Sequence, residues 1–293
     1  MNVSLDALDL IVQQAPHWAS VPKQDPEDMA FSAGAALAQL HIACGHTSVP
    51  ADLLIDRLAL TAAEASVTII GRSERASDLR DTLHLLRSGD EAGPAGAIYF
   101  TWRRAASRMI SVQNIGSALP EIQRSMIAQA LKKGRVCAIR HAADVFEKAL
   151  TEYPRSEAEA FVLADVALSH GLGWRKLVPL SARFIKASDL RKTGSELRTA
   201  FYLAVSAGAQ QATSLAIDLA RKAERLKQVQ PKLRAKGSGP AIELFLKRDA
   251  VAATSLMSDT MSDRAARRFC DRLVDLGVAR ELTHRPNFRL YGL

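Results

Sequence analysis

The stretch SDRAARRFCDRLVDLGVARELTHRPNFRLYGL, residues 262–293, decides the fold of the C-terminal part of the chain. Ser262 is a natural N-cap, and Asp263 follows at the first helical position, where a carboxylate favours a helix N-terminus. Apolar residues then recur at helical spacing until Gly277; they are Ala266, Phe269, Cys270, Leu273 and Leu276. The pattern predicts an amphipathic helix over residues 262–276.

A hairpin is expected directly after this helix. Apolar and polar residues alternate over residues 278–283 and again over 288–291. The intervening turn contains Pro286, and alternation on both sides of such a turn is typical of two antiparallel strands.

Two further helices are expected before residue 262, a short apolar one at 241–247 and a weak one at 251–257. Three helices followed by a two-stranded ribbon resemble a winged helix-turn-helix domain. That resemblance implies that helix 262–276 enters the major groove of double-stranded DNA, while the turn around His284 and Arg285 contacts its backbone or minor groove. The groove-facing cations would be Arg264, Arg267, Arg268 and Arg272.

Two observations keep an alternative open. The second helix, at 251–257, is short and has weak start and stop signals. In addition, Asp271 and Asp275 on the expected recognition helix, 262–276, would repel phosphates. Winged helices also dock on proteins, so a non-enzymatic interaction scaffold, with a protein partner or a second copy of the chain, is the rival hypothesis.

The segment before this module combines Pro and Gly with basic residues and predicts a linker at 231–240. We expect a helical domain at 1–230 and the winged module at 241–293. Three linker cations beside the module are expected to hold DNA phosphates without reading bases: Lys232, Arg234 and Lys236.

Charge is unevenly distributed along the 293 residues, although the net value is +8. Residues 1–99 contain 6 Lys and Arg against 13 Asp and Glu, residues 100–140 contain 8 against 1, and residues 220–237 contain 7 against 1. Concentrated basic charge indicates a polyanion-binding protein. Docking of the acidic N-terminal third on the basic stretches is the other interpretation.

The first 230 residues predict an all-α array or bundle, because apolar residues return at helical spacing between Pro and Gly breaks. Asp25 and Pro26 begin a helix that ends at Gly45. Further helices are expected at 51–70, 73–86, 120–133, 136–152, 156–170, 177–186, 194–207 and 209–229, with a basic helix after the loop at 89–96.

Other candidate sites are weaker. His41, Cys44 and His46 form a conceivable partial metal site, but a helix end and a core thiol explain them better. The loop at 93–96 precedes a helix and could bind phosphate, although a tight turn between helices is favoured. Tyr99 and Trp102 could stack on single-stranded nucleic acid, yet their helical spacing favours core packing.

No catalytic motif is found, so neither an enzyme nor a cofactor or metal is expected. The acidic N-terminus and the lack of a long apolar run predict no membrane span and a cytoplasmic location.

The whole chain resembles an uncharacterised alphaproteobacterial family of unknown function that occurs on plasmids and mobile elements. Matching phrases are GRSERASDLRDTLHLLRSGDEAGPAG at 71–96, LADVALSHGLGW at 163–174, PKLRAKG at 231–237, and the terminal stretch quoted above. The resemblance implies a bacterial setting but no activity. The basic segments and the winged-helix pattern, rather than this family resemblance, predict a DNA-binding transcriptional regulator or accessory DNA-maintenance factor.

Overall fold

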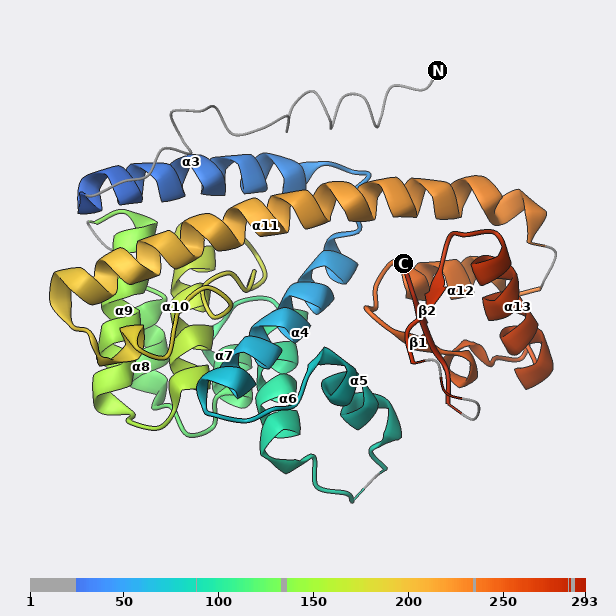
Figure 1. Ribbon diagram of the computed structural model, residues 1–293, viewed down its shortest axis with the longest axis horizontal. Helices are drawn as coiled ribbons and strands as arrows, with labels where there is room; N and C mark the ends of the chain where they lie inside the picture. The colour runs from blue at the N-terminus through green and yellow to red at the C-terminus, as the bar shows by residue number, and fades with distance from the viewer. Residues whose placement is uncertain (1–24, 88, 133–135, 234–235, 284, 286–287) are drawn as a thin grey trace. The chain divides into compact units, whose positions relative to one another are not determined.

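The computed structural model describes residues 25–293 except 88, 133–135, 234–235, 284 and 286–287. The described chain is mostly helical and ends in a small antiparallel sheet (Figure 1), which confirms the predicted all-α class. It forms two compact units. The helical unit comprises the described residues of 25–41 and 58–213, and the C-terminal unit comprises those of 42–57 and 214–293.

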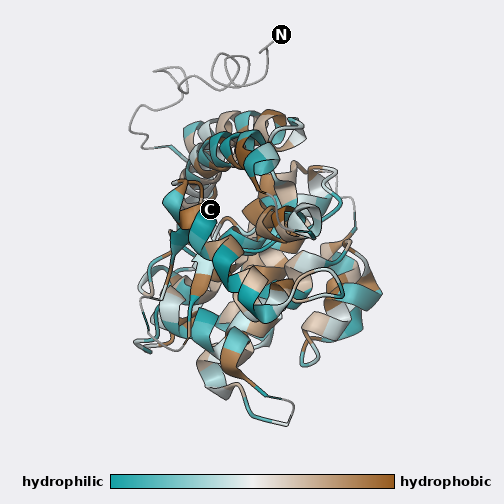
Figure 2. Ribbon diagram, turned by 90° about the vertical axis from the view of Figure 1, so that its right-hand side faces the viewer, coloured by the Kyte–Doolittle hydropathy of each residue, from teal (hydrophilic) through white to brown (hydrophobic). Residues whose placement is uncertain are grey.

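Three long helices contribute residues to both units: α3 (Pro26–Gly45), α4 (Ala51–Ile69) and α11 (Gly194–Val229). The helical unit also contains α5 (Ala76–Leu85), α6 (Gly93–Ser107), α7 (Val112–Ala118), α8 (Arg124–Ala130), α9 (Ala138–Glu152), α10 (Glu157–Gly171) and the short η1 (Asp189–Arg191). Both hydrophobic and hydrophilic residues occur along the helices (Figure 2). Among the described helices, none has the apolar length that a bilayer crossing requires.

The core of the helical unit is built around α10, which is buried on nearly every side. Helix α9 packs beside it (Figure 1), and the ring of Phe146 on α9 lies 4.9 Å from that of Phe161 on α10 and 5.4 Å from that of Phe201 on α11. Tilted aromatic pairs at these distances stabilise a core beyond the area they bury.

The helix expected at 177–186 is wrong. Residues 177–180 form no regular secondary structure and are buried against α10, and Pro179 removes an amide that a helix would need. The Asp165 carboxylate accepts the N–H of Leu180 at 2.8 Å, and the Ser169 hydroxyl accepts the N–H of Val178 at 3.1 Å. Two polar side chains of α10 thus replace the backbone partners that a buried irregular segment otherwise lacks.

The two helices expected at 194–207 and 209–229 form one continuous helix, α11. Gly208 does not end a helix here. Instead it allows the backbone of segment 177–180 to approach α11, because a Cβ at this position would overlap the carbonyl oxygen of Leu180.

The C-terminal unit contains η2 (Gln230–Lys232), α12 (Ser238–Phe245), β1 (Val251–Ala252), η3 (Ala253–Leu256), α13 (Asp263–Asp275), β2 (Arg280–Glu281) and β3 (Leu290–Gly292). The hairpin of β2 and β3 confirms the expected ribbon, with Glu281 opposite Tyr291. The prediction of a helix at 251–257 is wrong. Val251 and Ala252 form a third strand, paired with Tyr291 and Leu290, and only a 3-10 turn follows. The sheet order is β1-β3-β2.

A buried ion pair ties the start of α4 to the C-terminal sheet within this unit. The Arg57 Nε lies 2.8 Å from the Asp249 Oδ1, and its Nη2 donates to the carbonyl of Leu293 at 3.1 Å. The backbone N–H of Asp249 donates in turn to the Asp56 carboxylate at 3.0 Å. The unit therefore includes residues from before as well as after the predicted linker, while an independent winged domain at 241–293 stays a prediction.

Candidate nucleic-acid interface

Helix α13 forms as its sequence predicts. The Ser262 Oγ accepts the N–H of Ala265 at 3.4 Å, and Gly277 follows the helix with a left-handed φ of +66°. The predicted apolar face is buried, with Phe269 at 3% exposure and Leu273 at 0%. The opposite face is therefore directed to solvent.

The exposed face of α13 carries all four predicted arginines, Arg264, Arg267, Arg268 and Arg272. Arg267 Nε lies 3.0 Å from Asp263 Oδ2, one turn earlier, and both side chains are largely exposed. Within the described residues, the other three arginines form no ion pair. An exposed helix with arginines of this kind has the charge and shape required for the major groove of DNA.

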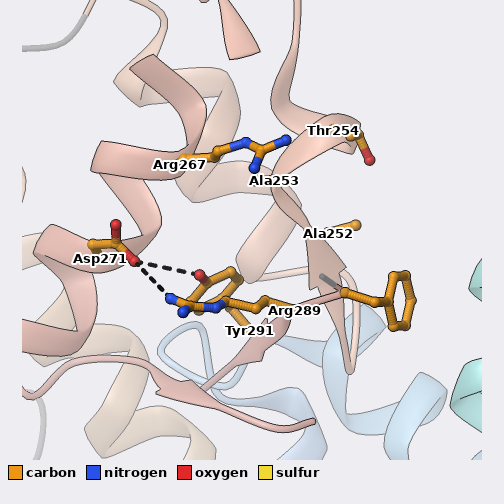
Figure 3. Close-up of a pocket in the computed structure, with 8 residues that line it drawn as sticks. Ala252, Ala253, Thr254, Arg267, Asp271, Arg289 and Tyr291 are labelled. Carbon is orange, nitrogen blue, oxygen red and sulfur yellow. Dashed lines mark hydrogen bonds and ion pairs between the residues drawn. The ribbon is translucent and has the colours of Figure 1, made fainter. Parts of the chain in front are cut away.

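Carboxylates lie on the same helix, as the sequence indicated. Asp271 and Asp275 are both exposed. Asp271 Oδ1 accepts the hydroxyl of Tyr291 at 3.4 Å and lies 3.8 Å from Arg289 Nη1 (Figure 3). Arg289 Nε is also 3.8 Å from Glu281 Oε1. One of the two carboxylates that would repel DNA is thus paired with a cation beside β3.

A cavity of about 320 Å³ opens between α13, η3 and the sheet of this unit. Figure 3 shows the residues around it, which are Ala252, Ala253, Thr254, Arg267, Asp271, Phe288, Arg289 and Tyr291. Burial raises the pKa of the Tyr291 phenol further above neutrality, and its hydroxyl is the group that donates to Asp271. Sequence reasoning missed Thr254, Arg289 and Tyr291, because only the pairing of β1 with β3 brings them next to α13.

The structure describes only some of the predicted DNA-contact residues outside α13. Lys232 ends η2, Lys236 precedes α12, and Arg285 lies between β2 and β3; all three are exposed. Arg234 and the turn residue His284 lie outside the described residues.

The basic run at 220–237 also contributes to this unit. Lys222 and Arg225 of α11 line a smaller cavity of about 140 Å³ together with Arg280 of β2. Lys222 Nζ lies 2.8 Å from Asp218 Oδ2, one turn earlier. Positive side chains from α11 and β2 therefore lie together, and the contribution of Arg280 could not be read from the sequence.

The aromatic residues of α6 belong to the core. Tyr99 is 1% exposed and Trp102 is fully buried, with its Nε1 donating to Ser66 Oγ at 3.0 Å. The packing interpretation is confirmed, and the stacking hypothesis for these two rings is wrong. The glycines at 93–96 form the first turn of α6.

The residues of the conceivable metal site have separate local roles. His41 Nδ1 accepts the indole N–H of Trp174 at 2.8 Å, whereas His46 Nδ1 lies 2.6 Å from Ser48 Oγ. Burial raises the pKa of the Cys44 thiol to about 11, which disfavours the thiolate that a metal would bind. No cluster of three metal-binding side chains occurs within the described residues.

The chain was compared with protein families and with curated proteins. The model of a family described as "Protein of unknown function (DUF1403)" matches residues 6–293. No curated protein matches the chain.

Proposed function

The chain belongs to the DUF1403 family of proteins of unknown function, and we propose that it binds double-stranded DNA through a winged helix in the C-terminal unit. Its role would be that of a transcriptional regulator or accessory DNA-maintenance factor. The resemblance of its sequence to a plasmid-borne bacterial family supports a setting in the bacterial cytoplasm.

The order of elements is the observation that carries this proposal. A helix (α12), a strand (β1), a short 3-10 helix (η3), a capped helix (α13) and a hairpin (β2, β3) follow one another, and the first strand pairs with the last. This is the connectivity of a winged helix, except that a 3-10 turn stands in place of the second helix. The strand β1 supports the proposal independently of the sequence pattern, which predicted a helix there.

Charge supports the same function. Four arginines on the exposed face of α13 can reach guanine edges or phosphates, and the exposed Lys232 and Lys236 can add phosphate contacts outside the groove. The basic side chains of α11 and Arg280 extend the positive charge of this unit.

The test is a fluorescence-anisotropy titration of the full chain with random duplex DNA at 50 and 200 mM salt. The variant Arg264→Ala/Arg268→Ala removes two exposed cations from α13 and no ion pair within the described residues. Loss of two phosphate contacts should weaken binding by about 10-fold or more and flatten the salt slope by about 1.8. Arg104→Ala, an exposed arginine of α6, is the matched control and should leave affinity unchanged.

Salt-sensitive binding by the parent chain that the double variant retains in full would refute the placement of DNA on α13. Absence of binding at 50 mM salt would refute the proposed function itself. That result would favour the rival hypothesis of a protein-docking module, for which Asp275 and the partly exposed Val274 on α13 are the supporting features.

A further inference from the structure

The cavity beside α13 is lined by side chains that can donate hydrogen bonds to phosphate oxygens. Arg267 projects from α13, Arg289 comes from the segment that enters β3, and Thr254 lies on η3 (Figure 3). Guanidinium and hydroxyl groups are the usual donors to phosphate oxygens in DNA complexes. Three elements that are distant in sequence therefore offer donors to one cavity.

Both guanidinium groups already have carboxylate neighbours. Arg267 Nε lies 3.0 Å from Asp263 Oδ2, and because these side chains are 68% and 44% exposed, the pair contributes little to stability. The Arg289 nitrogens lie 3.8 Å from the carboxylates of Asp271 and Glu281, which is too long for good hydrogen bonds. The side chains of Arg289 and Asp271 are 48% and 56% exposed, and exposed pairs contribute little to stability. A stronger acceptor can therefore replace Asp271 as the partner of Arg289 at little cost in free energy.

The position of the cavity favours a phosphate of duplex DNA as that acceptor. Arg267 belongs both to the cavity wall and to the arginine face of α13. When a helix lies in the major groove, the sugar-phosphate backbones border it on both sides. A residue at the edge of the helix, such as Arg267, then faces a phosphate.

We propose that this cavity is a phosphate-binding site, in which a backbone phosphate of duplex DNA replaces the Asp271 carboxylate as the partner of Arg289 and is held by Arg267, Arg289 and Thr254. The inference rests on the proposed function and adds to it. Asp271 is the internal competitor of the phosphate, and its carboxylate weakens DNA binding in the free protein.

Two substitutions at one ion pair therefore have opposite effects. Arg289→Ala removes the phosphate partner and should weaken binding of random duplex DNA by about 5- to 10-fold, with a salt slope flatter by about 0.9. Asp271→Asn removes the competing charge but keeps an oxygen that can accept the Tyr291 hydroxyl, and it should tighten binding about 2- to 5-fold. An ion pair that merely stabilised the fold would make both variants bind more weakly.

The measurement is the same anisotropy titration on the full chain, with Arg248→Ala as the control. Arg248 is an exposed arginine of the same unit that does not line the cavity. Thermal melts of all variants check that the fold is retained.

Opposite shifts for Arg289→Ala and Asp271→Asn, with no shift for the control, would support the site. Unchanged or equally weakened binding in both variants would overturn it while the proposed DNA-binding function stands. Failure of the parent chain to bind duplex DNA would overturn both.

Discussion

Replacing Arg57 by alanine is expected to destabilise the C-terminal unit by about 3 to 5 kcal/mol. The Asp249 side chain is only 2% exposed and the Arg57 side chain 12%, with 2.8 Å between Nε and Oδ1. Two charges about 4 Å apart attract each other by about 4 kcal/mol at an effective dielectric constant near 20. The variant also loses the hydrogen bond to the Leu293 carbonyl, so the upper part of the range is expected.

Hydrogen exchange measured by mass spectrometry can localise this loss. Peptides that contain β3 should exchange about 100-fold faster or more in Arg57→Ala, because every 1.4 kcal/mol of opening free energy is a factor of ten. Peptides from α10, in the helical unit, should change little. Arg248→Ala, an exposed neighbour of Asp249, should change either rate by less than about threefold, as expected of a surface substitution.

The double variant Arg57→Met/Asp249→Asn separates the ion pair from packing. Replacement of both partners by neutral side chains of similar size should cost less than Arg57→Ala alone, since no buried charge loses its counter-ion. A loss below about 1 kcal/mol in Arg57→Ala, or an equal loss in α10 peptides, would refute the assignment of this pair as the tie between α4 and the C-terminal sheet.

Two further predictions concern the helical unit. Burial raises the pKa of Asp165 to about 7, so between about pH 4 and 7 the folded state holds a proton that the unfolded state has released. The free energy of unfolding should therefore fall as pH rises through this range, by up to about 4 kcal/mol relative to Asp165→Asn. Urea titrations measure this, and equal pH profiles for the two proteins would contradict it. Gly208→Ala should lower the free energy of unfolding by about 3 kcal/mol, because the new Cβ would overlap the Leu180 carbonyl. Gly34→Ala on α3 should raise it by about 0.5 to 1 kcal/mol, because a Cβ at that position meets nothing within 4 Å. Thermal melts of both glycine variants check the second prediction, and similar shifts in the two would show that Gly208 is not needed for the close approach.

Local signals explain which parts of the candidate site could be predicted. The cap, the apolar spacing and the glycine stop of α13 all lie within residues 262–277, so the sequence predicts the helix and its exposed arginines correctly. Arg289 and Thr254 carry no local signal. They become part of one cavity only because β1 pairs with β3, and that pairing joins residues about 40 positions apart, as in Val251 with Tyr291.

The sequence by itself determined the helical class, the exposed arginines of α13, the hairpin, and the burial of Tyr99 and Trp102. Each of these follows from the pattern of residues that are close together in the sequence. Only the tertiary structure decided the non-helical course of residues 177–180, the third strand and the contact between Arg57 and Asp249. In each of these, a buried backbone amide or charge takes its partner from a distant segment. Local preference is worth tenths of a kcal/mol per residue, whereas an unsatisfied buried polar group costs one or more, so the distant partner determines the structure there.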